Sequence, residues 1–300
     1  MNTVNIKNIA KKFYYLLNNV TFSSSFQFNI GFIFHTEEIF NPAIHQTLIR
    51  FCKEYYAITG TKCICVTMTP PNKRVEKGMR LFGCSNQEYI NRMHELGEVA
   101  HIGFHGHFWH DPEKFEDADF DIRKNNTNYN YEVFYKQFEE QINWFYENNI
   151  PHNNTYSGGW WFLNKDLIEL LLNHDIKYDY TVSKSPNLWN PFTINLVEQN
   201  KIQYGETFYT SLNNKKLLHI QNLHSGHNTP FPQDSTRFMN TLLKKEFPQI
   251  TGVLNSHDYS LDFDYTIIWI RYLQQMPQVK FLNHQDFIKM PETDFKIIAL

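Results

Sequence analysis

Histidines gather in one short segment of the chain, His101-Ile-Gly-Phe-His-Gly-His-Phe-Trp-His110. Two other groups of polar residues follow apolar runs, His35-Thr-Glu-Glu38 early in the chain and Asn255-Ser-His-Asp258 late in it. A catalytic divalent metal takes about three His and carboxylate ligands and keeps one position open for water or substrate. The residue types in these three segments therefore predict a metal site with a hydrolytic role.

One set of three residues fits such a site best, namely His105, His110 and Glu37. His105 would end a strand, and His110 would return about one turn later toward the same ion. Two alternatives stay open: His107 can replace His110 through the i, i+2 geometry of a strand, and Glu38 can replace Glu37. Histidine with carboxylate favours zinc over magnesium or calcium.

Short apolar runs alternate with longer helix-like segments, and this order indicates an α/β fold with a parallel sheet or barrel. Ligands bind at the carboxyl ends of the strands in such folds, which is where the polar groups stand. We expect strands at 28–35, 62–68, 99–105, 154–157, 178–182, 216–221 and 251–257. We expect helices at 42–59, 131–149, 165–173, 234–245 and 263–275, and long loops at 69–83, 111–130 and 224–234. Loops of this length often form a binding or lid element.

Composition excludes several partners. With 28 Lys and Arg against 31 Asp and Glu, the net charge is -3 and neither sign forms a long block, which argues against nucleic acid and anionic membranes. We find neither a secretory signal nor an apolar run of about 18 residues, and therefore expect a cytoplasmic protein without a transmembrane segment. The four cysteines are expected to be reduced thiols in the core. No clean boundary divides residues 1–300, so a single domain is predicted.

The segment from Gly97 to His110 resembles the metal-binding motif of the polysaccharide deacetylases, the NodB-like enzymes of the carbohydrate esterase family 4 type. Phe-Ile-Phe-His-Thr-Glu-Glu, residues 32–38, resembles the first motif of that family. Residues 154–160 and 166–182 are similar to its third motif, and Val253-Leu-Asn-Ser-His257 resembles the motif that carries its histidine acid. The pieces occur in the family's order over about residues 28–290.

The resemblance implies a fold and a set of roles. The fold is a distorted seven-stranded (β/α) barrel with a core at about 28–290 and an N-terminal helical extension at 1–27. His35 stands where the family usually has an aspartate base, and His257 corresponds to its acid. Glu38 is a further candidate for the base, beside the metal ligand Glu37.

A substrate surface is predicted around a glycine turn. Tyr156 and Trp160 beside Gly158 and Gly159 suit sugar stacking and an oxyanion donor loop, with core packing as the alternative. Tyr156 occupies the position where the family usually has an arginine. His107 is expected to face the substrate when His110 binds the metal.

The implied activity is the metal-dependent removal of an N-acetyl group from an amino sugar during synthesis of a surface polysaccharide or O-antigen. The first alternative is a deformylase or another amidase that acts on a nucleotide-linked or lipid-linked sugar. The second is a sugar-binding barrel that has lost turnover. The substrate, the acyl group and the oligomeric state are not indicated by the sequence.

Overall fold

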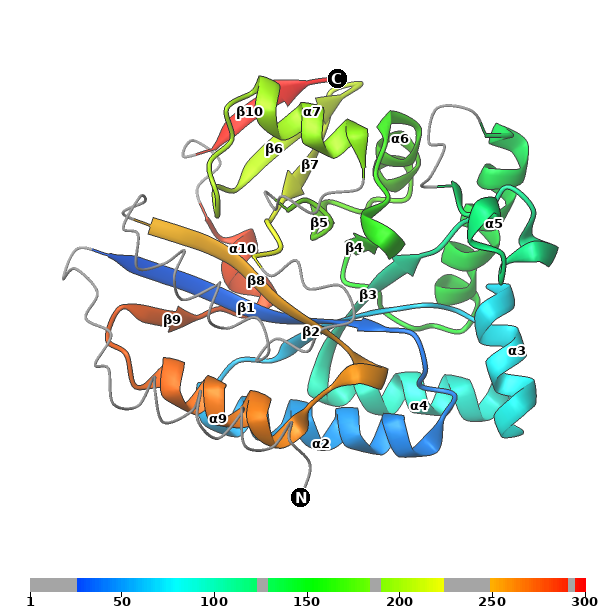
Figure 1. Cartoon of the computed structure of the whole chain (residues 1–300), viewed down its shortest axis with the longest axis horizontal. Coiled ribbons are helices and arrows are strands. Elements are labelled where there is room, and N and C mark those ends of the chain that lie inside the picture. Colours follow the sequence, from blue (N-terminus) through cyan, green and yellow to red (C-terminus); the bar gives the residue numbers. More distant parts are fainter. Residues whose placement is uncertain (1–25, 123–128, 184–189, 224–248, 291–294) are drawn as a thin grey trace.

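The computed structural model describes residues 26–122, 129–183, 190–223, 249–290 and 295–300. Its centre is a ten-stranded sheet in the order β10-β6-β7-β5-β4-β3-β2-β1-β8, with β9 also paired to β1 (Figure 1). The described strands pair in parallel, apart from the antiparallel pair β6 and β7. The strands are β1 (Gln27–Thr36), β2 (Cys63–Thr67), β3 (Ala100–Gly106), β4 (Thr155–Gly158), β5 (Tyr178–Asp179), β6 (Phe208–Leu212), β7 (Lys215–His219), β8 (Gln249–His257), β9 (Val279–Phe281) and β10 (Lys296–Ala299).

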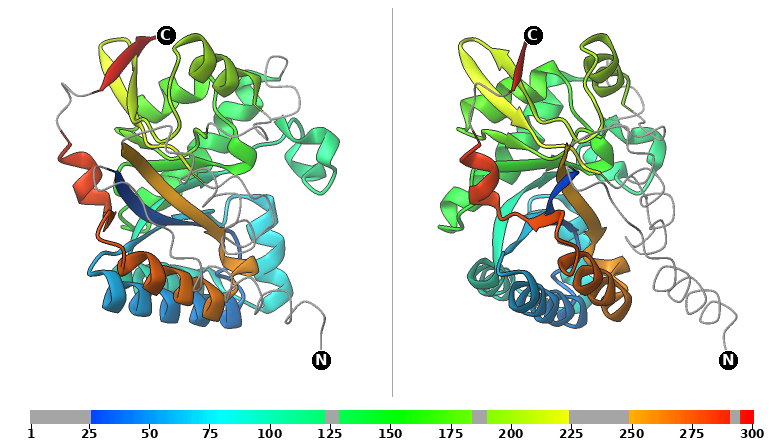
Figure 2. Two further views of the ribbon diagram at one scale, coloured as in Figure 1. Left: turned by 60° about the vertical axis from the view of Figure 1, so that its left-hand side comes forward. Right: turned by 90° about the vertical axis from the view of Figure 1, so that its left-hand side faces the viewer.

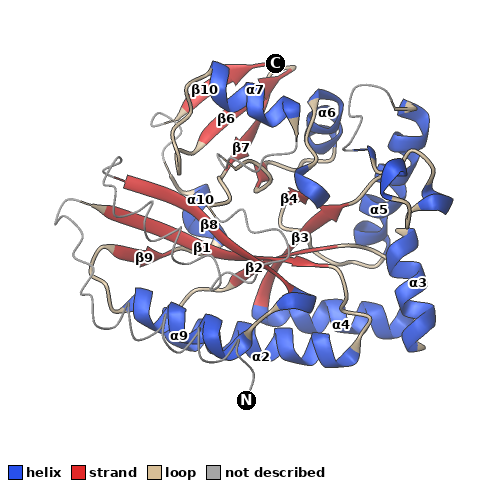
Figure 3. Ribbon diagram, viewed as in Figure 1, coloured by secondary structure: helices blue, strands red, loops and turns tan. Residues whose placement is uncertain are grey.

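Helices connect the strands, and most of them cover the outer side of the sheet (Figure 3), whereas Phe287 of the short helix α10 packs against the inner face. Helices α2 and α9 pack side by side along β1, and the turned views show both on the same side (Figure 2). The helices are α2 (Pro42–Thr59), α3 (Lys73–Phe82), α4 (Asn86–Val99), α5 (Tyr131–Glu147), α6 (Lys165–Asn173), α7 (Pro191–Gln199), α9 (Phe263–Gln274) and α10 (His284–Ile288). Two short 3-10 turns follow β3, and one follows each of β4 and β8.

Strand β1 shows how the core is divided. Successive side chains of a strand point to opposite faces, and Phe32 and Phe34 pack in the large cluster beneath the helices. Ile33 lies in a separate, smaller cluster on the inner face, together with Ile64 and Val253. Because His35 is two residues after Ile33, its side chain also points to the inner face, at the carboxyl end of β1.

The two ends of the parallel region approach each other. β8 pairs with β1 along its whole length, and on its other side Val253 forms a bridge with Asn222, just beyond β7. The Val253 N–H donates to the Gln221 carbonyl, and the Leu223 N–H donates to the Val253 carbonyl, both at 2.9 Å. The fold is therefore a mixed α/β structure that resembles a barrel.

Most of the predicted elements occur near the expected positions. Helix 42–59 is confirmed at both ends, since the Asn41 side chain accepts from the Ala43 N–H and Gly60 ends the helix at a φ of 72°. All seven predicted strands are present, although the run at 178–182 is a strand only over Tyr178–Asp179. The predicted reduced thiols are confirmed, because all four cysteines are free and buried.

The prediction of a loop over 69–83 is wrong. Residues 73–82 form α3, which begins at the cap Asn72 and ends at Gly83 with a φ of 63°. Pro70 and Pro71 gave the segment its loop-like composition. Gly78, which lowers helix propensity, is needed for packing, because a Cβ there would lie 2.2 Å from the Phe40 ring.

Some predictions fall on residues that the structure does not describe. These are the N-terminal extension for residues 1–25, the helix at 234–245 and the loop at 224–234. In the loop at 111–130 the described residues include two short 3-10 turns, Pro112–Lys114 and Ala118–Phe120. None of the described helices combines the length and apolar character needed to cross a membrane.

The fold should be sensitive to acid through His284, which is almost fully buried. Its Nε2–H donates to the Asn153 carbonyl at 3.0 Å, and its Nδ1 accepts from the Tyr180 hydroxyl at 3.0 Å, so the neutral ring is satisfied. Burial and the charge of His101 lower the pKa of His284 to about 4. A histidine in the unfolded chain titrates near 6.5, so the unfolded state binds more protons between these values and stability is lost as the pH falls through this window.

When the pH falls from 7 to 5, the unfolding free energy of the wild type should therefore fall by about 2 kcal/mol more than that of His284→Gln. Urea unfolding at the two pH values measures the difference. His94→Gln, at an exposed position of α4, is the matched control and should behave as the wild type does. Equal losses in all three proteins would show that His284 is not the sensitive group.

Candidate metal centre

The strand ends bring three inward-facing histidines together. His35 of β1 stands opposite His257 of β8 in the parallel register, and their rings lie 5.2 Å apart. The His105 ring of β3 stacks on the His35 ring at 4.6 Å. Each of these residues follows the inward-facing set of its own strand, so the alternation of the sheet directs them to one place.

Glu37 lies in the middle of this group, one residue beyond β1. Its Oε1 is 3.5 Å from His105 Nε2, 3.6 Å from His107 Nε2 and 3.6 Å from His257 Nε2. Among the described residues, Glu37, His105 and His107 form one group in which the potential ligand atoms all lie within 4.8 Å of one another. All three side chains are buried.

The second contacts of His105 show which of its atoms is available to a cation. His105 Nδ1 lies 2.7 Å from the Ser157 carbonyl oxygen. A carbonyl only accepts, so Nδ1 carries the proton and Nε2 carries the lone pair. This pairing of one ring nitrogen with a protein acceptor is the usual arrangement around a metal-ligating histidine.

The spacing of the donor atoms also fits a small cation. His107 Nε2 lies 3.2 Å from His105 Nε2, and the two distances to Glu37 Oε1 are 3.5 and 3.6 Å. Ligands placed tetrahedrally at zinc distances would be about 3.3 Å apart. The two nitrogens and one oxygen are therefore already arranged as one face of a zinc site, without a large movement of any side chain.

The charges of the group depend on burial and on these contacts. Burial alone would raise the pKa of Glu37, but contacts with His105 and His107, and the charge of Arg74, hold that pKa well below its usual range. Burial lowers the pKa of His107 to about 4, although Glu37 opposes this shift. At neutral pH Glu37 is therefore a carboxylate and His107 a neutral imidazole, the ionisation states that a metal requires.

His35 is also neutral. Burial, followed by the charges of His105 and His257, holds the pKa of His35 well below its usual range. Its Nε2 lies 3.0 Å from the Ser157 hydroxyl, which lies 3.3 Å from the Tyr180 carbonyl and donates to it. The hydroxyl therefore accepts from the Nε2–H of His35, and the Nδ1 of His35 is the basic nitrogen.

Asp258 fixes the backbone that carries Glu37. Its carboxylate accepts the N–H of Glu37 at 3.1 Å, that of Glu38 at 2.8 Å and that of Tyr259 at 3.0 Å. Burial raises the pKa of Asp258 to about 7, in spite of the backbone hydrogen bonds from Glu38 and Glu37. The end of β8 thus anchors the end of β1, and Glu37 does not depend on a free loop for its position.

Amide side chains from helix α5 and from the cap of helix α3 hold His107 in place. Gln141 Nε2 and Asn72 Nδ2 both donate to the His107 carbonyl at 3.2 Å. Gln137 exchanges two hydrogen bonds with the Trp109 backbone, at 3.0 and 2.8 Å. These hydrogen bonds fix the backbone just after the end of β3, at Gly106. The side chains of His105 and His107 therefore stay on the same face.

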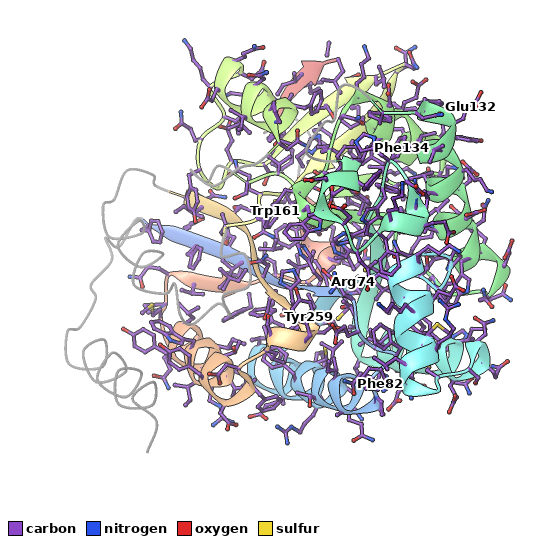
Figure 4. All side chains as sticks on the ribbon, turned by 45° about the vertical axis from the view of Figure 1, so that its right-hand side comes forward. Arg74, Phe82, Glu132, Phe134, Trp161 and Tyr259 are labelled. Atoms are coloured by element: carbon purple, nitrogen blue, oxygen red, sulfur yellow. The ribbon has the colours of Figure 1, made fainter. Side chains whose placement is uncertain are left out.

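A small cavity of about 20 Å³ lies over the group. Such a space holds about one water molecule or ion. It is lined by the histidines and Glu37, with Arg74, Tyr259, Trp160 and Trp161 at the same opening. Figure 4 shows Arg74, Tyr259 and Trp161 near one another in this part of the molecule.

The structure gathers most of the predicted residues but not His110. The His110 N–H donates to the Phe120 carbonyl at 2.6 Å, and the neighbouring Trp109 bridges to Asp121, so the chain turns away from the group after Phe108. His107 takes the place that was predicted for His110, as the i, i+2 alternative anticipated. His107, which was predicted for substrate binding, lies with Glu37 and His105 in the candidate group, and this position favours it as a metal ligand.

The two glutamates also differ in their surroundings. The Glu38 side chain is 28% exposed against 3% for Glu37, and burial raises the pKa of Glu38. Glu38 contacts the Arg74 guanidinium at 3.8 Å and is absent from the group of potential ligands in the described chain. The structure therefore places Glu37 at the centre of the group and Glu38 at the rim.

The predicted substrate surface is divided. Tyr156 is fully buried in the large core cluster, and its hydroxyl donates to the Phe162 carbonyl at 3.4 Å, so core packing, the alternative, describes it. Trp160 lines the cavity and has a φ of 53°, in the left-handed region. Gly158 and Gly159 are needed for close packing, because a Cβ at Gly159 would lie 2.3 Å from the His107 ring and one at Gly158 would lie 2.2 Å from the Phe162 carbonyl.

Three residues of the site were not found from the sequence. Ser157, Arg74 and Asp258 act through contacts with Glu37 or with the histidines, and such contacts join segments far apart in the chain. Asp258 directly follows His257, which was a usable signal. Arg74 gave none, because its helix was predicted as a loop.

Comparison with known proteins finds similarity in structure alone. No known family profile matches the sequence, and no curated protein matches it. The solved structure of 4-alpha-glucanotransferase from Thermococcus litoralis is similar with a TM-score of 0.53 at 9% identity, over 92% of this chain and 42% of that one. This chain thus spans about two fifths of the glucanotransferase chain, and at this identity the likeness concerns the fold alone.

Two further solved structures are similar at lower scores. One is a provisionally assigned polysaccharide deacetylase from Mycobacterium smegmatis, with a TM-score of 0.48, 12% identity, and coverage of 89% of this chain and 91% of that one. The other is a provisionally assigned cellobiose-phosphate cleavage protein from Enterococcus faecalis V583, with a TM-score of 0.45, 11% identity, and coverage of 87% and 99%.

The geometry predicts which histidines bind a metal. His105→Ala and His107→Ala should each weaken zinc binding by at least tenfold, because each removes a donor atom of the buried group. His110→Ala should bind zinc as the wild type does, because His110 lies outside the group. Titration with zinc against a chromophoric chelator measures all three. Loss of binding in His110→Ala with retention in His107→Ala would reverse this assignment.

Proposed function

We propose that the chain is a metal-dependent hydrolase that removes an acyl group, most simply N-acetyl, from an amino sugar. The observation that carries this proposal is the buried group of Glu37 Oε1, His105 Nε2 and His107 Nε2 at the carboxyl ends of parallel strands. Two nitrogen donors and one carboxylate leave a coordination position open, which is typical of catalytic rather than structural zinc sites. The resemblance of the sequence motifs to polysaccharide deacetylases supplies the acyl-sugar substrate.

The three residues of the group would hold one divalent cation, with zinc favoured by the donor types. When bound, such an ion polarises the acyl carbonyl and makes water more acidic. Glu37 keeps its negative charge for this role because its histidine neighbours and Arg74 hold its pKa low. The Ser157 carbonyl keeps the His105 ring in the tautomer that offers Nε2.

Two further histidines would handle protons. His35 is neutral, and its Nδ1 has the lone pair that can accept a proton from the attacking water. His257, which lines the same cavity, would donate a proton to the leaving amine. The products would be a carboxylate and a free amine. Glu38, at the rim and near Arg74, is the second candidate for the base.

The proposal also covers the fold, the domain organisation, the location and the biological role of the protein. A seven-stranded (β/α) barrel is supported by the bridge between Asn222 and Val253, which joins the segment just after β7 to β8. A single catalytic domain over 1–300, a cytoplasmic location and a role in surface polysaccharide or O-antigen synthesis follow from the sequence interpretation. A deformylase or other amidase for a nucleotide-linked or lipid-linked sugar uses the same geometry.

A sugar-binding barrel without turnover is the second candidate. It is favoured by His35, because burial and its histidine neighbours hold the pKa of this residue low and make it a weak base. Metal content does not separate the two candidates, since a site without turnover can still bind zinc. Turnover separates them.

The test is release of acetate from N-acetylated amino sugars by the purified protein, with and without a chelator. We expect release that stops when zinc is removed and returns when zinc is added. His35→Ala should lower the turnover number by roughly a hundredfold to ten-thousandfold and keep the metal, the usual contribution of a positioned base. His94→Ala, at an exposed position of α4, is the control and should keep full activity.

Zinc binding without release of any acyl group from acetylated or formylated amino sugars would favour the sugar-binding candidate. Full activity in His35→Ala would move the role of base to Glu38. Activity that survives complete removal of metal would exclude the metal-dependent reaction altogether.

A further inference from the structure

Arg74 lies outside the barrel-like sheet, on helix α3, and contacts the candidate metal group through Glu37. It belongs to the first turn of α3, and its Nη1 lies 2.6 Å from Glu37 Oε2. The Arg74 side chain is 33% exposed, whereas that of Glu37 is 3% exposed, so the pair joins the surface to the buried group. The guanidinium also lies 5.9 Å from the centre of the Tyr259 ring, at the opening of the cavity.

The two oxygens of Glu37 have different surroundings. Oε1 faces the Nε2 atoms of His105, His107 and His257, at 3.5 to 3.6 Å. Oε2 faces Arg74. A carboxylate that turned about its last bond would exchange these environments, and the ion pair with Arg74 opposes that rotation.

We propose that Arg74 is a positioning residue, which holds the Glu37 carboxylate so that Oε1 alone is directed at the two histidine donors. This inference rests on the proposed metal site and adds a role for a residue of α3. It concerns the orientation of a ligand and does not make Arg74 a group that touches the substrate.

Arg74 is itself held by the residue that helps to hold His107. Asn72 caps α3, and its Oδ1 accepts the Arg74 N–H at 3.0 Å. Its Nδ2 donates to the His107 carbonyl at 3.2 Å. One buried amide therefore ties the partner of Glu37 to the backbone of the neighbouring histidine ligand, so that the two are placed relative to each other.

The close packing of α3 makes this position rigid. Gly78 lies against the Phe40 ring, where a Cβ would approach to 2.2 Å, and Phe40 follows Glu38 by two residues. The Arg92 guanidinium donates to the Ile39 carbonyl at 2.9 Å, which fixes the same segment from α4. The helix that carries Arg74 and the loop that carries Glu37 are thus held together at a second place.

The consequence is a site that offers one oxygen and two nitrogens. Such a donor set suits zinc and related first-row metals, whereas calcium takes six to eight oxygens and often both oxygens of one carboxylate. Groups that orient metal ligands through a second contact typically change metal affinity by about ten- to a hundredfold when they are removed. Loss of Arg74 should therefore lower the affinity for zinc and alter the arrangement of the metal ligands.

The experiment compares Arg74→Met and Arg74→Lys with Arg80→Met. Arg80 lies on the same helix, is 69% exposed and pairs with Glu76, so it controls for loss of one arginine from α3. Zinc affinity is measured by competition with a chromophoric chelator, and cobalt(II) is then titrated into each metal-free protein to record its visible absorption spectrum. Thermal unfolding of the metal-free proteins reports whether each variant folds.

We expect Arg74→Met to bind zinc about ten- to a hundredfold more weakly and to show a changed cobalt spectrum. Arg80→Met should stay within twofold of the wild type with the same spectrum. Arg74→Lys should fall between them, at least threefold weaker, because a single ammonium does not fix the orientation of the carboxylate as the planar guanidinium does.

Several outcomes would overturn the inference. Affinity for zinc within twofold of the wild type in Arg74→Met, with an unchanged spectrum, would show that Arg74 does not orient Glu37. Tighter binding would show that its charge merely opposes the cation, and an equal loss in Arg80→Met would indicate a general effect on α3. If Arg74→Met does not fold, unchanged affinity in Arg74→Lys decides against the inference. A wild-type chain that binds no metal would instead refute the proposed function together with this inference.

Discussion

The site depends on one buried carboxylate. Glu37 is 3% exposed and would be costly to bury as a charged group without partners. Three histidines face one of its oxygens, and an arginine faces the other. A buried charge of this kind must be compensated, and side chains at the neighbouring strand ends together with Arg74 make the contacts that do so.

The supporting contacts come from elements far apart in the chain. Asp258, at the end of β8, accepts the N–H groups of Glu37 and Glu38, and Asn72, at the start of α3, bonds to the His107 carbonyl. Ser157 of β4 contacts both His105 and His35. The histidines are therefore held by backbone and side-chain hydrogen bonds before any cation is present, which limits the reorganisation that binding would require.

Periodicity explains what could be predicted from the sequence. The alternation in β1 places Phe32 and Phe34 against the helices and leaves His35 on the inner face, and the same alternation places His105. The polar residues at the strand ends were therefore expected to lie close together, and the structure places His35, His105 and His257 beside Glu37 or beside one another. The sequence interpretation preferred His110 to His107, but the position of each residue depends on where the chain turns away from the direction of β3. That point is set by hydrogen bonds from α5 that no local pattern reveals.

Helix α3 was missed for a related reason. Two prolines before it and a glycine within it indicate a loop by composition, and the packing that requires Gly78 involves Phe40, in a distant segment. Arg74 consequently had no predicted element to position it. Tyr156 was assigned to the substrate from a motif, although its place on the outward side of β4 puts it in the core.

The central claim is that a cation occupies the space between Glu37, His105 and His107. Crystals of the protein with zinc, measured on both sides of the zinc absorption edge, test it most directly. We expect one strong anomalous peak about 2.0 to 2.3 Å from Glu37 Oε1 and from the Nε2 atoms of both histidines. A peak bound by His110 instead, or none at this position with the three side chains ordered, would contradict the claim.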